Sequence, residues 1–145
     1  MAEVFFLDTN IFMYAAGAPH EYKDACVKIL NDLDLGKFTG IIDTELPQEL
    51  LYRYSSINLA AKGIQLCRDI FKYPLKILPV AQPDIQLAID LFETYRPHGL
   101  KPRDAIHAAI MQNHGMTKLL STDKDFNPLT FLTRIDPLAY SQSLP

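Results

Sequence analysis

The sequence lacks long apolar runs, which limits where the protein can work. Its apolar stretches are only a few residues long, far short of the roughly 20 residues that a membrane-spanning helix needs. It also lacks the start of a secretory signal peptide, because Glu3 stands where such a peptide carries basic residues. We therefore expect a cytoplasmic protein with no membrane segment.

The sequence also has few cysteines and no excess of basic residues. Cys26 and Cys67 lie far apart, with no second cysteine pair or neighbouring histidine at zinc spacing, so we interpret both as small buried apolar side chains. Lysine and arginine number 14 against 17 aspartates and glutamates, giving a net charge of −3. Nucleic-acid-binding domains usually show a basic excess. A phosphate ligand would therefore need a local basic rim or metal ions.

No internal repeat, low-complexity tract or linker divides the chain. Its 145 residues suit one hydrophobic core and are too few for two. The apolar share of 48% and the charged share of 21% are ordinary for a globular protein. We expect a single domain over residues 1–145.

Short apolar segments alternate with longer segments of helical periodicity. Strands are predicted at residues 3–8, 39–43, 75–80, 118–121 and 131–135. Helices are predicted at residues 11–16, capped by Asn10; 21–35; 44–57, capped by Thr44; 59–73, capped by Asn58; 83–96; and 102–114. The predicted apolar face is Ala60, Ile64, Cys67 and Phe71 in the helix over residues 59–73, and Ile85, Ala88, Ile89 and Phe92 in the helix over residues 83–96. Strands separated by helices favour parallel pairing, hence a three-layer α/β/α sandwich around a mainly parallel sheet of about five strands.

Acidic residues follow several of these strands. Asp8 ends the first strand and Asp123 directly follows the fourth, so both should emerge at the edge where ligands gather in parallel sheets. Glu45 and Glu49 come just after the second strand, one helical turn apart. Asp104 lies in the first turn of the last helix. Taken singly, Asp8 could merely cap a helix, and Asp104 could merely complement a helix dipole.

Carboxylates gathered at one edge would repel one another unless cations neutralised them. Oxygen-only ligand sets suit Mg²⁺ or Mn²⁺, which also bind substrate phosphates. Two such ions about 4 Å apart can activate a water and stabilise the leaving oxygen in phosphodiester cleavage. The metal would then supply the positive field that the protein lacks.

Four segments in this order resemble the PIN-domain family of metal-dependent ribonucleases. They are Leu7-Asp8-Thr9-Asn10, Leu46-Pro47-Gln48-Glu49-Leu50, Arg103-Asp104-Ala105-Ile106-His107-Ala108-Ala109 and Leu120-Ser121-Thr122-Asp123-Lys124-Asp125-Phe126. The resemblance implies a metal site of Asp8, Glu49, Asp104 and Asp123, with Asn10 and Thr122 as polar support and Asp125 as an additional ligand. It also implies RNA hydrolysis leaving a 5′-phosphate and a 3′-hydroxyl, and often a homodimer. Small members of the family are commonly VapC-type toxins inhibited by a cognate antitoxin.

Several assignments stay open from the residues alone. Glu45 and Glu49 could each face the cluster; the family pattern favours Glu49, and Glu45 and Asp43 are otherwise strand-end or helix-start charges. We interpret His107 as a partly buried helix histidine rather than a metal ligand. Around the acids, a modest phosphate-holding rim would come from Lys101, Arg103 and Lys124.

Other functions are consistent with the same pattern. The domain could be an RNA-binding or protein-docking module without catalysis, although all four acids are present. It could also process RNA outside a toxin–antitoxin pair. Phosphatases of the haloacid dehalogenase type begin with a similar strand, but they need a second aspartate where this chain has Asn10.

Overall fold

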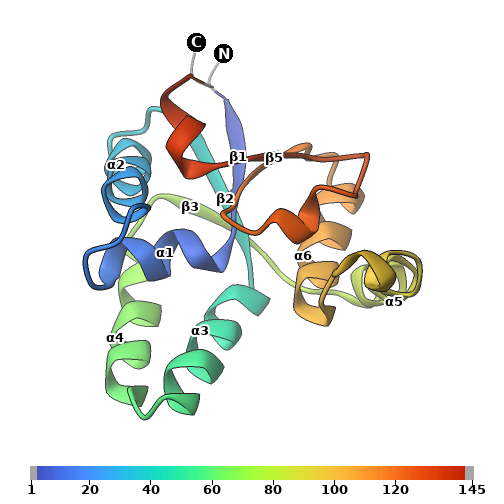
Figure 1. Cartoon of the computed structure of the whole chain (residues 1–145), viewed down its shortest axis with the longest axis horizontal. Coiled ribbons are helices and arrows are strands. Elements are labelled where there is room, and N and C mark those ends of the chain that lie inside the picture. The colour runs from blue at the N-terminus through green and yellow to red at the C-terminus, as the bar shows by residue number, and fades with distance from the viewer. Residues whose placement is uncertain (1–2, 143–145) are drawn as a thin grey trace.

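The computed structural model describes residues 3–142. The elements in chain order are β1 (Val4–Leu7), α1 (Thr9–Ala16), α2 (Lys23–Asp34), β2 (Thr39–Asp43), α3 (Glu45–Ser56), α4 (Ala60–Ile70), β3 (Leu75–Leu78), α5 (Gln82–Tyr95), η1 (Arg96–His98), α6 (Pro102–Asn113), β4 (Lys118–Leu120), η2 (Lys124–Phe126), β5 (Thr133–Ile135) and η3 (Pro137–Gln142). Within these residues the sheet has five strands in the order β3-β2-β1-β4-β5, and every neighbouring pair is parallel. Figure 1 shows α1 to α4 on one side of the sheet and α5 and α6 on the other. The predicted α/β/α sandwich is confirmed.

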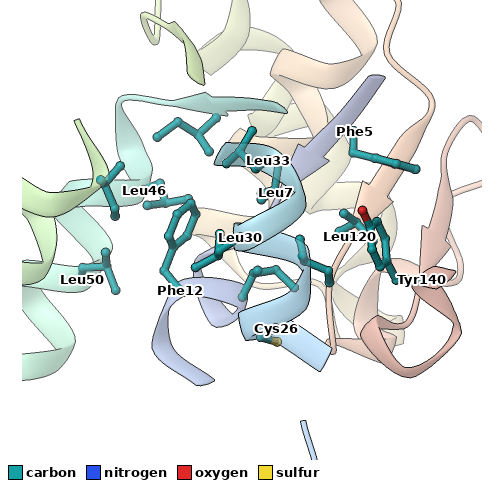
Figure 2. Packing of buried hydrophobic residues seen from close by; sticks show 14 of the residues in the cluster. Phe5, Leu7, Phe12, Cys26, Leu30, Leu33, Leu46, Leu50, Leu120 and Tyr140 are labelled. Carbon is teal, nitrogen blue, oxygen red and sulfur yellow. The ribbon is translucent and has the colours of Figure 1, made fainter. Parts of the chain in front are cut away.

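The central strand β1 is apolar throughout because helices cover both faces of the sheet. Phe5 and Leu7 point into a core shared with α1 to α4, and Phe6 points into the core under α5 and α6; all three are fully buried. Figure 2 shows the first core, where Phe12, Leu30 and other helix residues pack around Leu7, and Tyr140 packs near Phe5. Both cysteines are buried and unpaired, as expected.

The starts of three helices differ from the sequence prediction. Asp8, not Asn10, caps α1, because its carboxylate accepts the Thr9 N–H, and the strand ends at Leu7. At α3 the Asp43 carboxylate accepts the N–H groups of Glu45 and Leu46, while the Thr44 hydroxyl accepts from Val80. The helix α4 begins two residues after Asn58, whose φ of 61° is a left-handed conformation that asparagine tolerates.

The inward faces of α4 and α5 are also rotated relative to the prediction. Gly63 lets α4 approach α3, since a Cβ there would lie 2.7 Å from the Tyr54 Cβ, and this turns Ile64 and Phe71 outward. Asp84 is buried at the start of α5, where it accepts bonds from Ala81 N–H and Asn113 Nδ2. Ile89, predicted on the inward face, is instead 64% exposed.

The remaining differences are small. Strands β3, β4 and β5 are shorter than predicted, and the expected loop at residues 123–128 contains the 3-10 turn η2. None of the helices in residues 3–142 combines the length and apolar character needed to cross a membrane.

Candidate active site

Asp8 lies at the carboxyl end of the central strand and is 3% exposed. One carboxylate oxygen accepts the Thr9 N–H at 2.8 Å. The other accepts the Ser121 hydroxyl at 2.6 Å and the Asn10 amide at 3.0 Å. Asp8 is therefore both the cap of α1 and a rigidly held carboxylate at the edge of the sheet.

Ser121 and Asn10 join the end of β1 to the segment after β4. The Ser121 Oγ accepts from Asn10 Nδ2 at 3.2 Å and from the Asp123 N–H at 3.0 Å. Asn10 Oδ1 accepts the Thr122 N–H at 3.2 Å, so Thr122 contributes through its backbone. Sequence reasoning missed Ser121, although its place directly after a buried strand was a usable signal.

Asp104 and Asp123 reach the same edge from α6 and from the loop after β4. Asp104 is 6% exposed. Its burial, together with the charge of Asp8 and the proximity of Asp123, raises the pKa of Asp104 to about 8. Burial also raises the pKa of Asp8, with a further contribution from Glu49. These two carboxyls thus hold their protons more tightly than ordinary acids do.

Glu49 comes to this cluster from α3. Its Oε1 accepts the Thr9 hydroxyl at 2.9 Å, one residue from Asp8, and its Oε2 lies 3.3 Å from Arg53 Nε. Glu45 instead pairs loosely with Arg103, at 3.8 Å between Oε1 and Nε. Of the two glutamates, Glu49 shares contacts with Asp8, while Glu45 lies at the rim.

His107 is fully buried, more than the sequence predicted, and both ring nitrogens face carboxylates. Nδ1 lies 2.7 Å from Asp43 Oδ2, and Nε2 lies 3.3 Å from Glu49 Oε1. Burial alone would lower the pKa of His107, but the charge and hydrogen bond of Asp43, with help from Glu49, raise it well above its ordinary value. A nitrogen of His107 and oxygens of Asp8 and Asp104 lie within 4.8 Å of one another. Both ring nitrogens face carboxylates and the raised pKa favours the doubly protonated ring, a buried cation that has no free nitrogen to offer a metal.

Asp125 lies at the outer edge of the cluster. Its N–H donates to Asp123 Oδ1 at 2.9 Å, and its own carboxylate accepts from Lys101 Nζ at 3.1 Å. Gly99 allows this packing, since its φ is +102° and a Cβ there would lie 2.9 Å from Asp125 Oδ1. Asp125 is therefore paired with Lys101, a cation of the basic rim.

A cleft of about 420 Å³ opens beside two of the acids. Its lining residues are Glu49, Tyr52, Arg53, Lys101, Pro102, Arg103 and Asp104. The guanidinium carbon of Arg103 lies 4.2 Å from the centre of the Tyr52 ring. Lys101 and Arg103 are the rim cations that the sequence predicted here, and Lys124 is exposed in η2. Tyr52 and Arg53 were missed, although they follow Glu49 by three and four residues on one helix face.

The sequence matches the model of the PIN domain over residues 5–132. The chain belongs to the PIN-domain family. It is 32% identical over 130 residues to VapC ribonuclease Mb1869c of Mycobacterium bovis and to Ribonuclease VapC13 of Mycobacterium tuberculosis, covering 89% of this chain and 97% of each relative. All four predicted acids lie within the matched range.

Solved structures share the fold of this PIN domain. VapC20 of Mycobacterium tuberculosis, described as a sarcin-ricin loop cleaving toxin, has a TM-score of 0.74 at 12% identity, covering 88% of this chain and 96% of that one. VapBC2 from Rickettsia felis, bound to a DNA fragment from its promoter, has a TM-score of 0.68 at 21% identity, covering 92% and 98%. At these identities the likeness concerns the fold alone.

The donor set of this PIN domain fits a hard divalent cation. Its buried side chains offer carboxylate oxygens, the atoms that Mg²⁺ and Mn²⁺ prefer. Burial and neighbouring carboxylates raise the pKa values of Asp8 and Asp104, so a cation is needed nearby for both carboxyls to be ionised without a free-energy cost. The residues that would hold such a cation are Asp8, Glu49, Asp104 and Asp123.

Proposed function

We propose that this PIN-domain protein is an endoribonuclease that hydrolyses RNA phosphodiester bonds with Mg²⁺ or Mn²⁺ held by Asp8, Glu49, Asp104 and Asp123. The observation that supports it best is that three buried acids, from the end of β1, from α3 and from α6, meet the half-buried Asp123 of the loop after β4 at one edge of the sheet. The ribonuclease names of the two relatives at 32% identity support RNA as substrate.

Each residue of the site has a task in this reaction. The Thr9 N–H holds one oxygen of Asp8, and Ser121 and Asn10 hold the other. In Glu49, Thr9 and His107 meet Oε1 and Arg53 lies beside Oε2. A divalent cation held there would polarise the scissile phosphate and lower the pKa of a water. The water oxygen would bond to phosphorus as the bond to the 3′-oxygen breaks, and the proton lost by the water would pass to that oxygen, which leaves a 5′-phosphate and a 3′-hydroxyl.

We also propose that the protein acts in the cytoplasm as the toxin of a toxin–antitoxin pair. Support comes from the names of its relatives, which are VapC ribonucleases, and from the solved complexes that share its fold, such as VapBC2. The partner would be a cognate antitoxin protein. The homodimer implied by the family resemblance stays a prediction.

The test is RNA cleavage by the purified protein with Mg²⁺ or Mn²⁺, with EDTA, and in the Asp8→Asn variant. Asparagine caps helices as well as aspartate does, so this variant keeps the cap of α1 while it loses the charge and the oxygen that accepts from Ser121 and Asn10. We expect cleavage that EDTA abolishes and that Asp8→Asn removes while the unfolding transition persists. Asp90→Asn, on the exposed side of α5, is the matched control and should cleave normally. Metal-independent cleavage, or an active Asp8→Asn variant, would overturn the proposal.

A non-catalytic module is the competing function. Calorimetry with Mn²⁺ separates the two, because a module that had lost its metal site would show no binding at millimolar metal.

A further inference from the structure

The cleft beside Glu49 and Asp104 has a composition that the hydrolytic reaction alone does not require. Two acids of the site line it, and an aromatic ring with three cations makes up most of the remaining lining. Clefts that combine an aromatic surface with positive charge are typical of sites for single-stranded nucleic acid.

Tyr52 is held as an exposed ring with one face covered. Arg103 lies over the ring at 4.2 Å from its centre, and the Arg103 Nε is in turn 3.8 Å from Glu45 Oε1. Tyr52 is nevertheless 58% exposed. A large aromatic side chain left this open on α3, one helical turn from Glu49, offers its other face to a flat ligand.

The cations in the cleft are each tied to a carboxylate and still have donors to offer. Arg53 reaches Glu49 and Arg103 reaches Glu45 through Nε, and a guanidinium carries five N–H donors in all. Lys101 pairs with Asp125, and its Nζ has three donors. All three cations line the same cleft as Glu49, Asp104 and Tyr52, within which a nucleotide phosphate next to the cleaved bond would lie.

We propose that this cleft binds an unpaired nucleotide of the RNA next to the scissile phosphate, with its base stacked on Tyr52 and its phosphate held by Lys101, Arg53 and Arg103. The inference rests on the proposed ribonuclease function. It makes the substrate single-stranded at the cleavage position, because bases stacked inside a duplex cannot reach a protein ring. Stacking is tolerant of base identity, so this contact selects for unpaired structure more than for sequence.

Binding is tested by fluorescence anisotropy with labelled oligouridine and oligoadenosine, in the Asp8→Asn background with Mg²⁺ so that the probe stays intact. Tyr52→Ala should weaken binding of both probes by roughly 5- to 150-fold, the range for loss of one stacked base. Tyr52→Phe keeps the ring and should bind as the parent does. Phe71→Ala removes another ring that is 60% exposed, directly after α4. It is the matched control and should also bind as the parent does.

Salt dependence separates stacking from charge. Lys101→Ala should reduce the slope of log affinity against log salt by about 1, while Tyr52→Ala should leave the slope unchanged. An RNA duplex of the same length should bind the parent and Tyr52→Ala equally. Equal loss of duplex and single-strand binding in Tyr52→Ala would overturn the stacking assignment.

The same variants with Asp8 restored distinguish this inference from the proposed function. If the protein cleaves RNA and Tyr52→Ala changes neither binding nor cleavage, the cleft is not the nucleotide site while the ribonuclease stands. If Tyr52→Ala weakens probe binding but no RNA is cleaved with either metal, the nucleotide site stands and the ribonuclease does not. If Tyr52→Ala weakens only the binding of a protein partner, the cleft is a protein-docking surface and the inference is wrong.

Discussion

His107 Nδ1 lies 2.7 Å from Asp43 Oδ2 in a contact closed to solvent. The pair joins α6 to the end of β2, and the second ring nitrogen extends it to Glu49 on α3, at 3.3 Å. A cation buried among carboxylates thus links three elements at the edge of the sheet where the acids gather. It helps to explain how Glu49, although buried, keeps a pKa below its ordinary value: burial alone would raise this pKa, but His107, Thr9 and Arg53 together outweigh that effect.

Replacing His107 should destabilise the protein strongly. His107→Gln removes the cation and leaves the buried Asp43 uncompensated, which typically costs about 3–5 kcal/mol of the free energy of unfolding. Urea titration measures this loss. Lys72→Gln breaks the exposed ion pair with Asp69 and should leave stability nearly unchanged. A His107→Gln variant as stable as Lys72→Gln would contradict a buried ionised pair.

Ser121 should matter for metal binding without touching the metal. Its hydroxyl donates to Asp8 and accepts from Asn10 and from the Asp123 N–H, so Ser121→Ala releases two of the proposed ligands from their fixed directions. Loss of such supporting contacts typically costs about 10- to 100-fold in metal affinity. Calorimetry with Mn²⁺ measures it, and Ser55→Ala at the exposed end of α3 is the control. Unchanged affinity in Ser121→Ala would show that Asp8 does not depend on this hydroxyl.

Asp104 should lower the stability of the metal-free protein and contribute to metal binding. Its burial beside Asp8 makes the ionised form unfavourable, so Asp104→Asn should be at least as stable as the parent when metal is absent. With Mn²⁺ the parent should gain thermal stability, because a ligand that binds only the folded state stabilises it, whereas the variant should gain much less. Thermal unfolding with and without Mn²⁺ measures both effects. An equal gain in the two proteins would remove Asp104 from the proposed ligand set.

The hydrogen bond from Tyr140 to Asp32 should stabilise the fold in a pH-dependent way. The two oxygens lie 2.8 Å apart. Burial would raise the pKa of Asp32, but the Tyr140 hydroxyl, Lys28 and Lys37 together outweigh burial and hold this pKa below its ordinary value of 3.8. Since the folded pKa is the lower one, the stabilisation is full above 3.8 and is lost as the pH falls through the folded value.

Tyr140→Phe should therefore lower the free energy of unfolding by about 1.5–3 kcal/mol at neutral pH, the usual range for a hydrogen bond to a charged group. The difference from the parent should shrink in acid. Urea titrations at several pH values test this, with Tyr52→Phe at an exposed ring as the control. A loss of the same size at every pH would mean that packing, not the carboxylate, accounts for it.

The sheet and the positions of the acids were predictable from the residues because strand signals are local. A continuous apolar run such as Phe5–Phe6–Leu7 predicts a strand that is covered on both faces of the sheet. Asp8, which directly follows the run, must then emerge at the edge of the sheet. Helix orientation was less predictable. Buried contacts of Gly63 and Asp84 with neighbouring helices set which sides of α4 and α5 face inward, against the apolar periodicity.

By itself the sequence determined the alternation of strands and helices, the parallel sheet and the chain order of four acids at its carboxyl edge. Only the tertiary structure shows that Glu49 accepts from Thr9 and faces His107, 40 and 58 residues away, since one helical turn places Glu45 and Glu49 on the same face of α3. The same holds for Ser121 beside Asp8 and for Arg103 over Tyr52. Such contacts join residues from separate elements, and no local pattern encodes a distance that arises only when those elements pack.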